Sequence, residues 1–130
     1  MREIKFRGKR KDNKEWVYGY LVLDGRERHC YIVFVDWLPE DNIDDVDYIE
    51  VYKHTIGQFT GLYDKNGKEI YEGDIIDTGY DKWIVKFGNG SFYATIPNTS
   101  FFLDLSRETI NYYEIKVIGN IYDNPELIKS

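Results

Sequence analysis

The amino-acid sequence predicts an all-β protein, organised as a small barrel with an N-terminal antiparallel β extension and a short C-terminal helical turn. Aromatic residues make up 17% of the 130 residues, and aromatic and β-branched side chains favour strands. No stretch of the chain has the apolar spacing of an amphipathic helix. Turn-forming pairs recur instead, at Asp24-Gly25, Asn66-Gly67 and Asn89-Gly90. Short antiparallel strands joined by tight turns are typical of small barrels.

The first part of the chain is predicted to form four strands, over residues 2–7, 15–24, 29–36 and 48–53. A basic turn leads from the first to the second, and Asp24-Gly25 turns the second into the third. The third strand has apolar side chains on both faces, which is typical of a strand at the centre of its sheet.

The pair Asn66-Gly67 predicts a turn that begins at Asp64 and holds Gly67 in the left-handed conformation. In this turn Asp64 faces Lys68 and accepts hydrogen bonds from backbone amides. A shorter, two-residue loop would place Asp64 opposite Glu69, and like charges that face each other destabilise a sheet. The longer, bulged turn is therefore favoured.

The pair Asn89-Gly90 predicts a hairpin with a two-residue turn. The facing pairs are then Phe87 with Phe92, Val85 with Ala94, and Trp83 with Ile96. This register places apolar side chains on one face and mostly polar ones on the other, as a half-buried pair of strands requires.

Two further strands are predicted over residues 70–77 and 112–118, and Gly73 predicts a bulge or bend in the first of them. Residues 37–47 and 97–110 are interpreted as loops, the second with a brief helical turn near Ser106. The segment Asp123-Asn124-Pro125 predicts the terminal helical turn, because proline is favoured at the first helical position.

Charge is unevenly distributed along the chain. Its 17 basic and 23 acidic residues give a formal net charge of −6, so the surface as a whole does not attract nucleic acid. Residues 36–50 contain seven acidic residues and no basic one. We interpret this stretch as a candidate surface for binding another protein or a second copy of the chain, although charge runs usually face water. Its candidate residues are Asp41, Asp44, Asp45 and Asp47.

Residues 1–28 are basic and aromatic, which suggests the alternative of a nucleic-acid-binding barrel. The candidate basic residues are Arg7, Lys9, Arg10 and Lys11, and the aromatic residues beside them are Phe6, Trp16, Tyr18 and Tyr20. Small barrels bind single strands by stacking bases on exposed aromatic side chains next to basic ones. Aromatic residues on strands more often belong to the core, however, and the acidic net charge weighs against this alternative.

Residues suited to catalysis or metal binding are few, and we expect neither an enzyme nor a cofactor or metal. His29 and Cys30 are neighbours on a predicted strand, so their side chains point to opposite faces. The other histidine, His54, is not at a metal-ligand spacing from them. Cys30 lies in an apolar run and is expected to be a buried, inert thiol.

Glu72, Asp74 and Asp77 form a compact set of carboxylates beside Gly73. Paired carboxylates can divide acid and base roles or hold a hard cation. A structural interpretation is favoured instead, in which Asp74 accepts hydrogen bonds from local backbone amides at a turn.

A cytoplasmic protein is expected from three further features. No apolar run approaches the roughly 20 residues of a membrane span, so no membrane association is expected. Residues 1–10 are charged, unlike a secretory signal. The single cysteine, Cys30, cannot form an internal disulfide, which suits a reducing compartment.

Three segments resemble the YopX family of phage and prophage proteins. They are residues 2–8 (REIKFRG) with 16–19 (WVYG), residues 55–64 (TIGQFTGLYD) with 67–75 (GKEIYEGDI), and residues 117–127 (VIGNIYDNPEL). The resemblance implies one domain over residues 1–130, with an N-terminal β region over 1–54 and an SH3-like barrel over 55–130. It also implies action inside a bacterial cell, but no catalytic residue, cofactor or ligand. Exposed sheet edges, twelve tyrosines and separated charge blocks suit a protein interface. We expect a non-enzymatic protein-interaction module whose partner, a host or phage protein or a second copy, is unknown.

Overall fold

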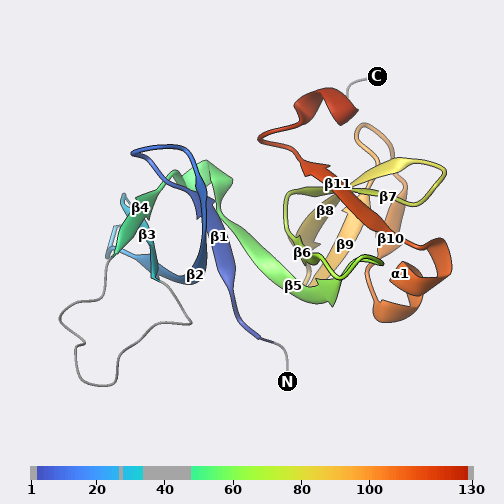
Figure 1. The fold of residues 1–130 in the computed structure, drawn as a ribbon, viewed down its shortest axis with the longest axis horizontal. Helices are drawn as coiled ribbons and strands as arrows, with labels where there is room; N and C mark the ends of the chain where they lie inside the picture. Colours follow the sequence, from blue (N-terminus) through green and yellow to red (C-terminus); the bar gives the residue numbers. More distant parts are fainter. Residues whose placement is uncertain (1–2, 27, 34–47, 129–130) are drawn as a thin grey trace. The chain divides into compact units, whose positions relative to one another are not determined.

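Antiparallel strands dominate the computed structural model, which describes residues 3–26, 28–33 and 48–128 (Figure 1). The strand order is β4-β3-β2-β1-β5-β6 in one sheet and β10-β9-β8-β7-β11 in the other, and neither sheet closes on itself. The chain divides into an N-terminal unit, Met1–Phe59, and a C-terminal unit, Thr60–Ser130. The all-β prediction is confirmed, whereas the SH3-like barrel stays a prediction.

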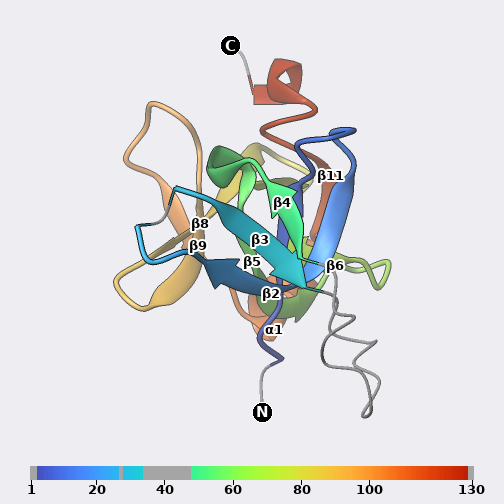
Figure 2. The same cartoon turned by 90° about the vertical axis from the view of Figure 1, so that its left-hand side faces the viewer.

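Among the described residues of the N-terminal unit, four strands precede β5, and Figure 2 shows β2, β3 and β4 toward the viewer. The strands are β1 (Phe6–Lys9), β2 (Trp16–Leu23), β3 (Cys30–Val33) and β4 (Ile49–Val51), followed by the 3-10 helix η2 (Lys53–Thr55). Strand β3 lies between β2 and β4, as its apolar pattern predicted. Strand β5 (Gly57–Tyr63) begins in this unit, where Gly57 and Gln58 pair with β1.

The segment that follows β1 lies along β4. Arg10 and Val51 form an isolated bridge, and the Tyr52 N–H donates to the Lys9 carbonyl at 2.9 Å. Gly8 permits this close approach, because a Cβ at this position would lie 2.9 Å from the side chain of Val51. The strands thus wrap around one apolar core, whose buried members are Val17, Cys30, Ile32 and Val51.

The C-terminal unit contains the second sheet and the only α-helix of the described residues. Its elements are β6 (Glu69–Tyr71), β7 (Asp74–Asp77), β8 (Lys82–Gly88), β9 (Ser91–Thr95), β10 (Phe102–Asp104), α1 (Arg107–Tyr113), β11 (Lys116–Asn120) and η3 (Pro125–Ile128). The buried core is formed by Ile70, Ile76, Val85, Ala94, Ile110 and Ile115. No helix in the described part of the chain is long and apolar enough to cross a membrane.

Both predicted hairpin registers are confirmed. Phe87 pairs with Phe92 and Val85 with Ala94, and the turn residues Asn89 and Gly90 both have positive φ angles, of 52° and 80°. This is the backbone of a tight two-residue turn.

In the other turn the Asp64 N–H donates to the Lys68 carbonyl at 2.8 Å, and Gly67 has a φ of 84°. Gly73, with a φ of 93°, separates β6 from β7, as its position predicted. The terminal helical turn begins at Pro125 and is also confirmed.

Two predictions near the C-terminus are wrong in detail. Residues 97–110 are not simply a loop, because they contain β10 and the start of α1. The strand predicted over residues 112–118 begins only at Lys116, because α1 extends to Tyr113 and ends at Glu114 in the left-handed conformation. The helical turn expected near Ser106 does form, and the Ser106 side chain accepts a hydrogen bond from the Thr109 N–H.

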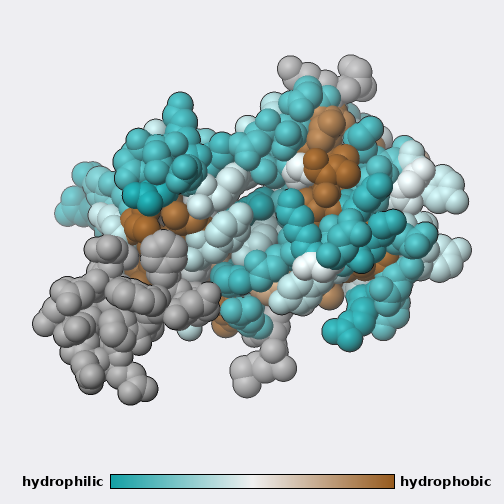
Figure 3. Space-filling model, in the orientation of Figure 1, coloured by the Kyte–Doolittle hydropathy of each residue, from teal (hydrophilic) through white to brown (hydrophobic). Residues whose placement is uncertain are grey.

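Each unit has its own cluster of buried hydrophobic residues. On the face drawn in Figure 3, hydrophilic residues predominate and hydrophobic ones form separate small areas. Among the described residues, the exposed aromatic side chains are chiefly tyrosines, which combine an apolar ring with a polar hydroxyl group.

Candidate interaction surface

The N-terminal unit has an aromatic face on the side of its strands that points away from the core. Strand residues alternate between two faces, and Val17 and Cys30 belong to the core. Their neighbours therefore lie on the opposite side, where Tyr18 faces Arg7 of β1, and Tyr31 faces Glu50 of β4. We define the aromatic face as Trp16, Tyr18, Tyr20, Tyr31, Tyr48 and Tyr52.

Several members of the aromatic face are open to solvent. The exposed fractions are 42% for Tyr18, 44% for Tyr20 and 59% for Tyr48. Tyr31 contacts Tyr48 edge to face, with 6.1 Å between the ring centroids. The strands thus present several tyrosine rings to the outside instead of burying them.

Basic side chains lie over the rings of this face. The Arg7 guanidinium is 4.6 Å from the centroid of the Trp16 ring, and the Lys9 ammonium is 5.5 Å from it. The Lys11 ammonium is 6.0 Å from the centroid of the Tyr52 ring. These distances fall within the range of cation–π attraction. Arg7 itself is only 5% exposed, so its charge is held within the surface rather than displayed on it.

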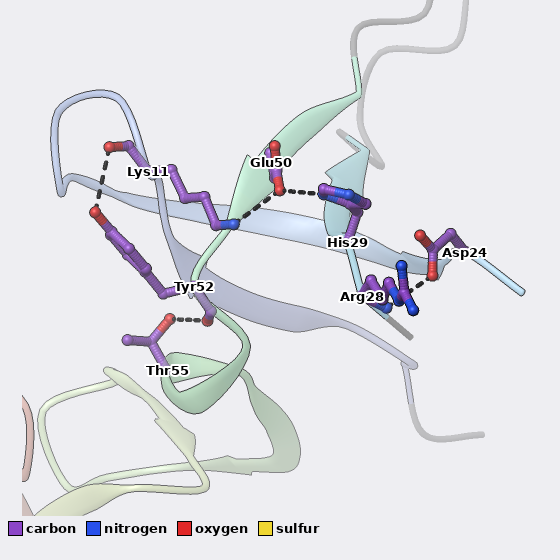
Figure 4. Close-up of polar contacts among 7 residues, drawn as sticks. All are labelled: Lys11, Asp24, Arg28, His29, Glu50, Tyr52 and Thr55. Carbon is purple, nitrogen blue, oxygen red and sulfur yellow. Dashed lines mark hydrogen bonds and ion pairs between the residues drawn. The ribbon is translucent and has the colours of Figure 1, made fainter. Parts of the chain in front are cut away.

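Beside the aromatic face, Glu50 joins His29 and Lys11 in a polar cluster, drawn in Figure 4. Its Oε2 atom lies 2.8 Å from His29 Nδ1 and 2.9 Å from Lys11 Nζ. The hydrogen bonds from His29 and then from Lys11 lower the pKa of the Glu50 carboxyl below its usual value. The bond to Glu50 in turn raises the pKa of Lys11. These side chains come from three segments that the strands bring together.

Arg10 is paired as well. Its Nε donates to Asp12 Oδ1 at 2.9 Å and its Nη2 to Asp12 Oδ2 at 2.7 Å. This two-pronged bond lowers the pKa of Asp12 and raises that of Arg10. Carboxylates therefore hold both Arg10 and Lys11, two of the basic residues considered for nucleic-acid binding.

The other sequence-predicted site residues are placed as follows. Tyr18 and Tyr20 are exposed on the aromatic face, so the expectation that strand aromatics belong to the core is wrong for these two. Trp16 is half-buried on the same face, whereas Phe6 packs against the core. The acidic candidates Asp41, Asp44, Asp45 and Asp47 lie outside the described residues.

The buried-thiol interpretation of Cys30 is confirmed, since its exposed fraction is 1%. His29, its neighbour on the opposite face, is exposed. No group of three or more histidine, cysteine or acidic side chains among the described residues could hold a metal ion.

Two of the carboxylates near Gly73, those of Asp74 and Asp77, accept hydrogen bonds from backbone amides. Asp74 is 2% exposed and accepts a hydrogen bond from the Tyr71 N–H at 2.7 Å, which confirms its structural interpretation. Asp77 accepts one from the Gly79 N–H at 2.7 Å.

Sequence reasoning missed the cluster of Glu50, His29 and Lys11. His29 is 21 positions and Lys11 is 39 positions from Glu50 along the chain. The only available signal was strand alternation, which requires the pairing of β3 with β4 to be known.

Comparisons with known proteins identify relatives of the chain. A family model described as YopX protein matches residues 5–129. Among solved structures, the chain is similar to the crystal structure of protein EF1440 from Enterococcus faecalis, with a TM-score of 0.62 and 24% sequence identity, covering 99% of this chain and 100% of that one. At this identity the likeness concerns the fold alone. No curated protein matches the chain.

Proposed function

The chain belongs to the YopX family, and we propose that it is a non-enzymatic protein-interaction module that binds a partner protein through its aromatic face. The observation that carries the proposal is the exposure of Tyr18, Tyr20 and Tyr48 on one side of the N-terminal unit. Within the proposal, the protein is encoded by a phage or prophage and acts in the bacterial cytoplasm on a host or phage protein.

The chemistry of the aromatic face suits a protein interface. Tyrosine, tryptophan and arginine are the residues that most often dominate binding energy, because they bury a large area and also offer hydrogen bonds. Here Arg7 and Lys9 already lie over Trp16. Because this stacking already restricts these side chains, they lose less conformational entropy when a partner binds.

Nucleic-acid binding is the second candidate, favoured by the position of Trp16, Tyr18 and Tyr20 on the same face as Arg7 and Lys9. It is the weaker candidate because Lys11 and Arg10 are paired with carboxylates and the chain carries a net charge of −6. Nucleic-acid binding would weaken steeply with salt, since phosphate contacts release counterions.

Within the same proposal, residues 55–130 form a barrel of the SH3-like type. Short antiparallel strands and tight turns in the C-terminal unit support this. Comparison of an experimental structure of that region with known SH3-like barrels is the direct test.

A tagged pull-down from the host lysate tests the proposed function. The variant Tyr20→Ser with Tyr48→Ser removes two exposed rings of the aromatic face. The matched control, Tyr80→Ser with Tyr112→Ser, removes two rings of the C-terminal unit that are 85% and 80% exposed. We expect the first variant to weaken partner capture by about tenfold or more and the control to retain it.

Nuclease treatment of the lysate separates the two candidates. Capture that depends on Tyr20 and Tyr48 and survives nuclease supports the protein interface. Capture that nuclease abolishes favours nucleic-acid binding, and equal capture by both variants excludes the aromatic face.

A further inference from the structure

The two edge strands of the C-terminal sheet, β11 and β10, differ in how many of their outward backbone groups are already hydrogen-bonded. On the outer side of β11, the Val117 N–H donates to Asp64 Oδ2 at 2.9 Å. The Lys65 N–H donates to the Ile115 carbonyl at 2.9 Å, and the Asn120 N–H donates to Asn124 Oδ1 at 3.2 Å. Two outward N–H groups of β11, and the carbonyl of the residue just before it, are therefore already bonded within the chain.

Strand β10 forms the opposite edge. It pairs with β9 through Phe102 with Thr95, Leu103 with Ala94, and Asp104 with Tyr93, and no strand of the described residues pairs with its other side. Exposed edges of this kind are templates for the backbone of another polypeptide.

The hydrogen-bond pattern shows which groups of β10 point outwards. The Leu105 N–H donates to the Phe92 carbonyl at 3.4 Å, and in antiparallel pairs the bonded positions recur every second residue. Leu103 is thus the next residue bonded to β9. The N–H and C=O groups of Phe102 and Asp104 point away from β9, where they form the short ladder that an added strand requires.

A hollow of about 380 Å³ lies on the sheet face beside this edge. Its lining includes Tyr93, Phe101, Phe102 and Asp104, and Asp104 is the only charged side chain among the described residues that line it. The Tyr93 ring covers Gly88, while Phe101 and Phe102 are 64% and 67% exposed. The rest of the lining is small and polar, so three aromatic rings and one carboxylate are its distinctive groups. Rings beside a carboxylate are complementary to a cationic side chain with an apolar stem.

We propose that β10 is the docking edge for an extended segment of a partner polypeptide that carries a lysine or arginine. The segment adds a strand to β10 by bonding the outward groups of Phe102 and Asp104. Because side chains alternate along a strand, every second residue faces the hollow, and the basic one lies over the rings beside the Asp104 carboxylate. This site is in the C-terminal unit and does not depend on the aromatic face.

An NMR titration of the intact ¹⁵N-labelled chain tests the proposal. The probe is a short acetylated peptide in which valine and lysine alternate, and the matched control peptide carries glutamate in place of lysine. We expect the largest amide shifts at Phe102 and Asp104, and binding of the glutamate peptide about tenfold weaker. Shifts elsewhere, or equal binding of the two peptides, would overturn the proposal.

Two substitutions, with a third as a control, distinguish strand addition at β10 from nonspecific binding of the peptide. Phe102→Pro removes an outward N–H without removing a bond to β9, and proline is tolerated at such edge positions. It should abolish binding of the lysine peptide while leaving the remaining spectrum in place. Asp104→Asn should weaken that binding about fivefold, and Tyr80→Ser should leave it unchanged.

The outcomes of these variants are decisive in either direction. Undiminished binding to folded Phe102→Pro protein would show that the edge is not used. Sedimentation velocity gives an independent check, since self-association that Phe102→Pro removes would assign the edge to a second copy and also overturn the proposal.

Discussion

The side chain of Asp64 connects a turn to a distant strand, and replacing it with asparagine should separate these two roles. Oδ1 accepts from the N–H groups of Asn66 and Lys68 at 2.8 and 2.9 Å, whereas Oδ2 accepts from the Val117 N–H at 2.9 Å. Asp64 is 6% exposed. Asparagine keeps one carbonyl oxygen for the turn but presents an NH₂ group to the Val117 N–H, which loses its acceptor.

The size of the effect follows from this geometry. A hydrogen bond to a charged acceptor contributes about 1.5–3 kcal/mol, and a buried donor without a partner costs about as much as its desolvation. We expect Asp64→Asn to lower the free energy of unfolding by about 2–3 kcal/mol, or Tm by roughly 10 °C for a domain of this size.

Asp24→Asn is the matched control. Asp24 also accepts two turn N–H groups, from Arg26 at 3.2 Å and Arg28 at 2.8 Å, and both bonds go to Oδ1. Because asparagine can retain both, this variant should change stability by no more than about 0.5 kcal/mol.

Hydrogen exchange of the core amides under mild denaturant measures both variants unit by unit. Core amides of the C-terminal unit, such as that of Val85, report the unfolding of that unit alone. If Asp64→Asn and Asp24→Asn proved equally mild, the bond to Val117 would contribute nothing and the reasoning would be refuted.

Three further predictions concern single contacts. Glu50→Gln should flatten the acid limb of the stability curve. Hydrogen bonds from His29 first and from Lys11 second lower the pKa of Glu50 in the folded protein. The stabilisation they give is therefore present above the Glu50 pKa of the unfolded chain and is lost as pH falls through the lower pKa of the folded protein. An acid limb that is unchanged in Glu50→Gln would contradict this. Ser106→Ala should cost about 1 kcal/mol through loss of the α1 N-cap, measured by thermal unfolding, and no change would mean that water replaces the cap. Gly119→Ala should speed exchange of the amide that the Asn124 side chain caps, because a Cβ would lie 2.5 Å from Asn124 Oδ1; unchanged exchange would show that this loop can move aside.

Local turn chemistry made part of the fold predictable. Asn89-Gly90 and the turn at Asp64 each fix their register within a few residues, because the left-handed glycines and the turn carboxylate act locally. The bond from Val117 to Asp64 could not be predicted, since nothing in the sequence relates two residues 53 positions apart.

The region from Ser106 to Lys116 shows why the secondary structure was partly wrong. Tyr112 and Tyr113 have strand-forming side chains, which favoured a strand from residue 112. The Ser106 cap instead starts a helix that buries Ile110. A short helix of this kind has too few turns for its apolar period to be recognised.

The aromatic face was predicted only in part, for a different reason. Alternation along β2 separates Val17 from Trp16 and Tyr18, but alternation alone does not say which set faces the core. The choice depends on β3 and β4, whose Cys30 and Val51 pack against Val17. The sequence therefore singled out Trp16, Tyr18 and Tyr20 without their orientation, and it did not single out the tyrosines of β3 and of the β4 segment.

The two proposed surfaces have no residue in common, so their binding energies should be independent. The variant Tyr20→Ser with Tyr48→Ser should bind the lysine peptide with the affinity of the unchanged chain, within about twofold. NMR titration of that variant measures this directly. A larger change would mean that the two surfaces are energetically coupled. Coupling between binding sites is reciprocal, so it would also appear when the partner of the aromatic face is titrated against the peptide-bound protein. Independence would instead leave a protein able to hold two segments at once, by tyrosine rings in one unit and by backbone groups in the other.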